Sequence, residues 1–164
     1  MLFEIIRHTP KWVFALFFVL LIVGYLQTKR RTVKLKTVFI LPISMIILSV
    51  FGVASAFGAM PIAFAAWFIA GLFALAIVLK WRPTQGISYA RAEKIFFVPG
   101  SWAPLFLMMA IFSTKYIVGA AIAQQLPIIS DINFIALVSL LYGCFSGIFL
   151  SRSIGIWQVK KASS

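Results

Sequence analysis

The sequence predicts an all-α polytopic membrane protein with five transmembrane helices, and three observations carry this prediction. Hydrophobic residues make up 63% of the 164 residues, charged residues make up 11%, and the mean hydropathy is +1.07. Soluble domains are about 45–50% apolar and about 25% charged. Five apolar runs follow one another along the chain, and basic residues gather in alternate connections between them. An ordinary soluble domain, a disordered chain and a disulfide scaffold are therefore excluded.

Four of the five apolar runs reach the roughly 20 residues that a helix needs to cross the hydrocarbon core. We place the spans at about residues 10–27, 38–57, 61–80, 102–125 and 132–151. Because only one connection between them is long, we expect a single transmembrane bundle over residues 1–164.

The first run is the shortest and has a competing interpretation. It crosses a membrane only if its helix begins at Pro10, and Thr9-Pro10 supports that start because threonine caps helices well and proline suits a first turn. A cleaved signal peptide would also be apolar here. However, the run has no A-x-A-like site and ends in Lys29-Arg30-Arg31, which blocks translocation. We therefore predict a retained first span.

The connection between the third and fourth spans is long enough to fold by itself. Residues 86–89 and 95–98 are short, β-prone apolar runs on either side of a charged stretch, and Gly86 and Pro99-Gly100 bracket them. This pattern favours a short cytoplasmic hairpin over the alternative, an amphipathic surface helix. Two strands alone are marginal in water, so the hairpin must lean on the bundle or on the membrane.

The basic residues predict the orientation in the membrane. Twelve of the 15 Lys and Arg residues fall on one side of the predicted spans, two fall on the other side, and Lys115 lies inside the fourth span. By the positive-inside rule, the N-terminus is outside and the C-terminus is cytoplasmic. The net charge of +12 then indicates basic loops that contact the bilayer and its anionic headgroups on the cytoplasmic side, and not nucleic acid.

Lys115 is the strongest functional signal, because a lysine at mid-span costs roughly 2.5–3.5 kcal/mol on translocon scales. Three interpretations are open. The ammonium snorkels to the outer interface, it forms a structural ion pair, or it contacts a substrate or ion.

Polar residues expected on the outer side could surround this lysine. Glu4, His8 and Asp131 all fall there, and with Tyr116 they form a predicted outer-leaflet polar cluster around Lys115. The alternative for Glu4, His8 and Asp131 is simple exposure at a wet surface. For Asp131 a second alternative is capping of the fifth span.

Polar residues also predict which spans are enclosed. The fourth span carries several within its apolar run, whereas the third span carries none between residues 62 and 79. We therefore expect the fourth span to be interior and the third to face lipid. The polar residues of the fourth span are Ser113, Thr114, Tyr116 and Gln124.

The fifth span shows small residues at every fourth position. Small side chains let helix backbones approach closely, which matters because lipid offers no hydrophobic drive for helix association. The stripe predicts close helix packing, either within the chain or between two copies of it. Its members are Ser139, Gly143, Gly147, Ser151 and Gly155.

No pattern of catalytic or metal-binding residues is visible. Cys144 is the only cysteine and His8 the only histidine, so an intrachain disulfide and a His/Cys metal cluster are excluded. The chain has no glycine-rich phosphate loop and no Ser-His-Asp set, and its titratable candidates are scattered over three segments. We expect no enzyme activity, no cofactor and no metal, and an inert, packed Cys144.

Two stretches carry a family resemblance. They are RHTPKWV at residues 7–13 and PGSWAPL running on to FSTKY at residues 99–116, with LYG and FSG later in the chain. They resemble a family of small bacterial inner-membrane proteins catalogued only as a domain of unknown function, and the similarity covers most of the chain. The resemblance implies a bacterial inner-membrane location and marks Lys115 as a family feature. It implies no activity.

Two functional expectations follow. The first is a non-enzymatic accessory or assembly protein, whose partner is a second copy or another membrane protein. The alternative is a small transporter or ligand-binding membrane protein with an outer-facing polar pocket around Lys115. The surroundings of Lys115 separate the two: a roomy polar pocket favours the alternative, and contact with lipid or full pairing favours the accessory role.

Overall fold

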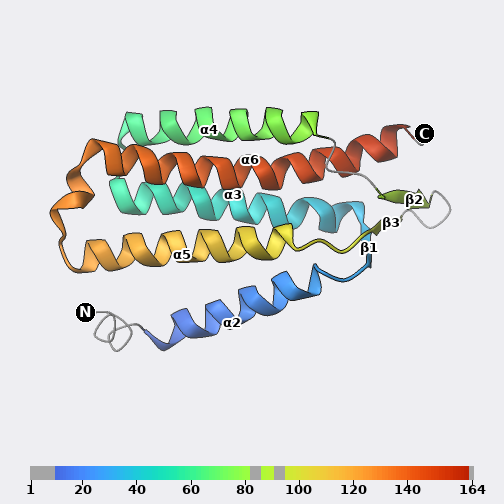
Figure 1. Ribbon diagram of the computed structural model, residues 1–164, viewed down its shortest axis with the longest axis horizontal. Coiled ribbons are helices and arrows are strands. Elements are labelled where there is room, and N and C mark those ends of the chain that lie inside the picture. Colours follow the sequence, from blue (N-terminus) through green and yellow to red (C-terminus); the bar gives the residue numbers. More distant parts are fainter. Residues whose placement is uncertain (1–9, 82–85, 91–94, 163–164) are drawn as a thin grey trace.

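The computed structural model describes residues 10–81, 86–90 and 95–162. Its helices run side by side as a bundle, with a small sheet at the end from which α6 projects (Figure 1). The helices are α2 (Lys11–Leu26), α3 (Leu35–Phe57), α4 (Pro61–Lys80), α5 (Ala103–Ala123) and α6 (Ile132–Ala162), with a short 3₁₀ helix, η1 (Pro127–Ser130), before α6.

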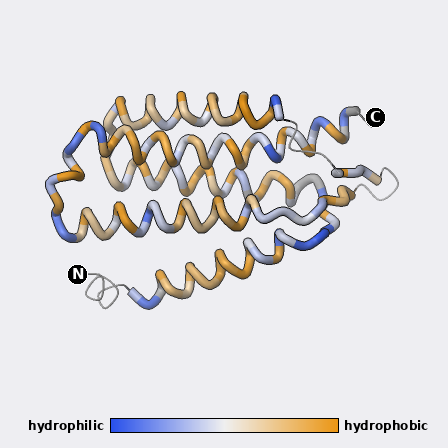
Figure 2. Tube along the Cα trace, viewed as in Figure 1, coloured by the Kyte–Doolittle hydropathy of each residue, from blue (hydrophilic) through white to orange (hydrophobic). Residues whose placement is uncertain are grey.

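Four of these helices, α3 to α6, are long and apolar enough to cross a membrane. The fifth, α2, is a 16-residue apolar helix, and at 1.5 Å per residue it covers about 24 Å of a core that is about 30 Å thick. The long apolar helices confirm a mostly helical protein with four candidate membrane-spanning helices, and the fifth span remains a prediction. Figure 2 shows hydrophobic residues along the helices and hydrophilic ones gathered towards the ends of the bundle.

The three strands form one antiparallel sheet. β2 (Ser88–Ala90) and β3 (Ile95–Val98) pair as expected of the predicted hairpin, and β1 (Arg31–Lys34) adds to the other side of β3 to give the order β1-β3-β2. Arg31 lies opposite Val98 in the register. Sequence analysis did not find β1, because its four residues RTVK are too basic and too few to show a strand pattern.

The sheet packs against the helices. A short hairpin needs such support because it is only marginally stable by itself in water. Phe96 and Val98 of β3 are buried against Val38 of α3 and Ile156 of α6. This contact uses the part of α6 beyond residue 151, where we had ended the span. The last helix continues to Ala162 as one piece.

The centre of the bundle is α6, and not the fourth span as its polar residues led us to expect. Half of the apolar stretch of α6 is buried, against 22% of α5. The small-residue stripe explains this. A Cβ on Gly143 would collide with the carbonyl oxygen of Trp67, and a Cβ on Gly147 would collide with that of Gly71, so the backbones of α6 and α4 are in contact. Side-chain size, more than polarity, decides which helix is central.

The apolar third span, α4, has two different faces. Ala63, Ala70 and Ala74 are buried, whereas the outward side carries exposed Phe68, Ile69 and Phe73. Two linked hydrogen bonds cross the core: Trp67 Nε1–H donates to Ser49 Oγ at 2.9 Å, and that hydroxyl donates to the Tyr142 carbonyl at 3.0 Å. They tie α4, α3 and α6 together.

Candidate anion-binding pocket

The predicted outer polar cluster is not assembled by the residues that the structure describes. The Lys115 ammonium lies over the ring of Phe51 in α3, 5.7 Å from its centroid, in a cation–π contact. Phe51 is 65% exposed, so Lys115 sits at the outer surface of the helices and not in an enclosed cavity. Tyr116 stacks on Phe112, with ring centroids 6.3 Å apart.

Asp131 caps a helix, which was the alternative interpretation of this residue. Its carboxylate accepts the Asn133 N–H at 2.8 Å at the start of α6. Within the described part of the chain, no ion pair joins Asp131 to Lys115. Glu4 and His8 lie outside the described residues.

All five residues of the small-residue stripe lie buried along α6. Ser151 Oγ donates to the Ile148 carbonyl at 2.7 Å, within its own helix. Ser139 is fully buried, and its hydroxyl has no hydrogen-bond partner. With Gly143 and Gly147 against α4, the stripe is a packing surface within the chain.

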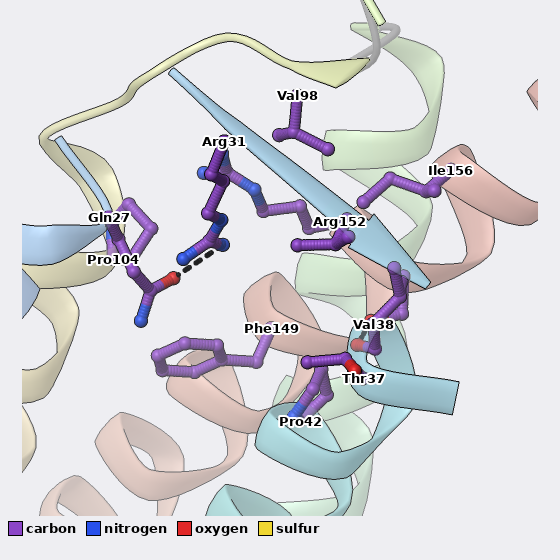
Figure 3. Close-up of a pocket in the computed structure, with 12 residues that line it drawn as sticks. Gln27, Arg31, Thr37, Val38, Pro42, Val98, Pro104, Phe149, Arg152 and Ile156 are labelled. Atoms are coloured by element: carbon purple, nitrogen blue, oxygen red, sulfur yellow. Dashed lines mark hydrogen bonds between the residues drawn. The ribbon is translucent and has the colours of Figure 1, made fainter. Parts of the chain in front are cut away.

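A pocket of about 220 Å³ lies at the sheet end of the bundle. It opens where the end of α2, the strands β1 and β3, and the first turns of α3 and α5 meet α6 (Figure 3). None of its 12 lining residues is His, Cys, Asp or Glu. They are Gln27, Arg31, Val33, Thr37, Val38, Pro42, Val98, Pro104, Phe149, Arg152, Ser153 and Ile156.

Gln27 is held in this pocket by the junction between α2 and the β3–α5 connection. It ends α2, and its carbonyl accepts the Ser101 N–H at 3.1 Å. Gly100 permits this approach, because a Cβ there would collide with the Thr28 carbonyl. The Gln27 side chain is only 4% exposed.

The buried polar atoms that remain unpaired in the pocket are N–H donors. An Arg31 Nη2–H donates to Gln27 Oε1 at 3.0 Å, which uses the acceptor end of that amide. Gln27 Nε2 and Arg31 Nε are buried and have no acceptor among the residues that the structure describes. A buried donor without an acceptor costs about 1–3 kcal/mol. A ligand made only of acceptors would satisfy both.

Arg152 brings a second positive charge to the same place. Figure 3 shows its side chain extending from α6 across the pocket towards Arg31, and the two guanidinium groups are close enough to repel each other. Burial lowers the pKa of Arg31, but guanidinium groups stay protonated in proteins. The pocket therefore holds two positive charges.

No carboxylate among the described residues balances these charges. Asp131 is the only acidic residue there, and it precedes α6, roughly 30 Å along the helix from Arg152 at 1.5 Å per residue. The buried unpaired donors, two guanidinium groups and apolar walls from Val38, Pro42 and Phe149 suit one class of ligand, an oxyanion. The lining offers no nucleophile–base pair, and no group of metal-ligating side chains occurs in the described segments.

The site was not predicted from the sequence, in which Arg31 and Arg152 indicate only the orientation of the protein. One signal was available: Arg152 is the only charged residue between residues 132 and 159, and it lies next to Ser151 of the small-residue stripe. Its partner could not be found, because Arg31 reaches the pocket only through the undetected strand β1.

Fold and pocket together define a class: a helical protein with four helices long and apolar enough to cross a membrane, and a basic pocket at one end. The chain belongs to a family of unknown function, DUF6622, whose model matches residues 1–163. The predicted resemblance to an uncharacterised family is thereby confirmed. Neither the curated proteins nor the solved structures contain a match to this chain.

Proposed function

We propose that this protein is a non-enzymatic membrane protein that binds an anionic ligand in the pocket between Arg31 and Arg152. The observation that carries the proposal is the pair of buried, acceptor-free donors, Gln27 Nε2 and Arg31 Nε, beside a second guanidinium group. A structural arginine pair would be expected to have an acidic partner, because an uncompensated buried charge is costly.

The proposal extends to the membrane. We propose that the protein crosses the bacterial inner membrane several times, that α2 is the first of five spans, and that the C-terminus is cytoplasmic. The basic connections support this orientation. The pocket then faces the cytoplasm, and a bound anion would serve an accessory or assembly role alongside a second copy or another membrane protein.

Lys115 belongs to a different part of the molecule in this proposal. It lies about three helical turns along α5 from the pocket residue Pro104, and its contact is an exposed aromatic ring. This contact with an exposed ring supports the accessory role over a transport pocket at Lys115.

Thermal unfolding of the purified full-length protein in a neutral detergent tests anion binding. Inorganic phosphate is compared with chloride at equal ionic strength. A ligand at ten times its Kd stabilises the folded state by about 1.4 kcal/mol, so phosphate raises the melting temperature of the parent protein. Arg152→Gln removes most of this rise.

The Arg152→Gln protein should also be at least as stable as the parent without phosphate, because the substitution removes charge repulsion in the pocket. Lys80→Gln is the control, since it removes one exposed positive charge from the C-terminal end of α4. Equal phosphate responses in all three proteins would overturn the proposal.

A further inference from the structure

We propose that the anion is the phosphate monoester headgroup of a membrane lipid, held between Arg31 and Arg152 at the level where the spans begin. This inference rests on the proposed function, that the pocket binds an anion, and adds the chemical class and the source of the ligand. The depth of the pocket, its charge and its volume support it.

The pocket lies at the depth of lipid headgroups. Its lining includes Thr37, where the apolar stretch of α3 begins, and Pro104, in the first turn of α5. Thr37 is exposed, so the pocket reaches the molecular surface at this level. In a bilayer, the ends of apolar stretches lie at the boundary between hydrocarbon and headgroups. A lipid phosphate in the headgroup layer is therefore at the same depth as this opening.

The charge of the pocket matches a phosphate monoester. Two guanidinium groups with no described carboxylate give a charge of +2. A phosphate monoester carries about −1.5 to −2 at pH 7 and presents three terminal oxygens. A phosphodiester carries a single negative charge, so it would leave one of the two arginines uncompensated.

The donors are suited to those oxygens. Arg31 Nε and Gln27 Nε2 are fixed by the hydrogen bond between their side chains, so they reach a ligand already oriented. Arg152 approaches from α6 on another side (Figure 3). Guanidinium groups bind phosphate through two parallel N–H···O bonds. An anion placed there satisfies donors from two elements at once.

The volume limits the part of the lipid that enters. A pocket of about 220 Å³ has room for a phosphate with a few attached atoms. The apolar walls from Val38 and Phe149 then suit the first carbon atoms beside the phosphate. The acyl chains remain outside, in the bilayer.

Native mass spectrometry of the full-length protein in detergent tests the lipid class. Phosphatidic acid, which ends in a phosphate monoester, is compared with phosphatidylglycerol and phosphatidylcholine of the same chains. Phosphatidic acid adducts should exceed the others about tenfold on the parent protein, and Arg152→Gln should remove this preference. Arg152→Lys, which keeps the charge and loses the paired donors, should give an intermediate value, and Lys80→Gln the parent value.

The pH dependence is a second readout. The second pKa of a phosphate monoester is about 6, and arginine does not titrate in this range. Phosphatidic acid binding should therefore strengthen as the pH rises from 5 to about 7.5, while phosphatidylglycerol binding stays flat. Equal adducts of the two lipids at all pH values would overturn the monoester assignment.

Soluble probes separate the source of the phosphate from the existence of the site. Glycerol 3-phosphate carries the same headgroup without acyl chains. If it competes with phosphatidic acid at equal concentration, the lipid assignment is wrong and the anion site stands. If neither probe distinguishes the parent from Arg152→Gln while both proteins remain folded, the proposed function fails as well.

Discussion

Arg31 and Arg152 come from distant parts of the sequence and enter one pocket, where the described chain provides no acidic partner for either. Arg31 arrives on a strand that the sheet holds against β3, and Arg152 arrives on the central helix. Like charges brought together by the fold raise its energy, because burial weakens solvent screening. Such a cost is expected at a site whose ligand supplies the missing charge.

We predict that Gly147→Leu destabilises the protein. The new side chain would collide with the Gly71 carbonyl of α4, and overpacking of a close contact typically costs about 1–3 kcal/mol. Gly119→Leu is the control, because a Cβ at Gly119 meets no atom within 4 Å. Thermal unfolding in detergent should show a lower melting temperature for Gly147→Leu only. If both variants melted alike, the α4–α6 contact would not limit stability.

We predict that Ser49→Ala also lowers stability. It leaves the Trp67 indole N–H without its acceptor, and a buried unsatisfied group costs about 1–3 kcal/mol. The Tyr142 carbonyl loses the Ser49 hydroxyl but keeps the Ser146 hydroxyl as a donor. Ser44→Ala on the same helix is the control. It removes only an exposed hydrogen bond from the Ser44 hydroxyl to the Ile40 carbonyl and should have little effect. A Trp67→Phe, Ser49→Ala double variant should recover part of the loss, and additive losses would argue against the hydrogen bond.

We predict that Lys115 couples to Phe51 and not to Asp131. An exposed cation–π contact is worth about 0.5–1 kcal/mol, so a double-mutant cycle of Lys115→Met with Phe51→Leu should give a coupling energy of that size. The cycle of Lys115→Met with Asp131→Asn should give a coupling energy near zero. Strong coupling to Asp131 would instead restore the ion pair that the sequence suggested.

We predict that the two ends of the chain lie on opposite sides of the membrane. Five spans, with α2 among them, put the N-terminus outside and Ser164 in the cytoplasm. A fluorescent reporter that works only in the cytoplasm should be bright when fused after Ser164, and a periplasmic phosphatase should be active at the N-terminus. An inactive phosphatase at the N-terminus with a bright C-terminal reporter would mean that α2 does not cross.

The sequence predicted the long apolar helices and the hairpin because their signals are local. Apolar length alone indicates a spanning helix, and the β-prone runs around residues 88 and 96 lie next to each other in sequence. The spacing of Gly143 and Gly147 likewise indicated close packing before any partner was known.

The rest depends on contacts that sequence patterns do not record. Polar residues such as Thr114 suggested an enclosed fourth span, but Thr114 Oγ1 donates to the Ala110 carbonyl within its own helix and needs no neighbouring helix. Strand β1 forms because β3 offers it an edge, and the pocket exists only after that pairing brings Arg31 towards Arg152. Tertiary structure creates the site, so residue spacing could not reveal it.

Locating a bound anion tests the central claim most directly. Crystals of the full-length protein grown with selenate, an anomalous scatterer with the shape of phosphate, would show where the anion binds. We expect one strong selenium peak in the pocket, with selenate oxygens within about 3.2 Å of both Arg31 Nε and Gln27 Nε2 and the Arg152 guanidinium on its other side, and no such peak in Arg152→Gln. An empty pocket in the parent protein at saturating selenate would contradict the account.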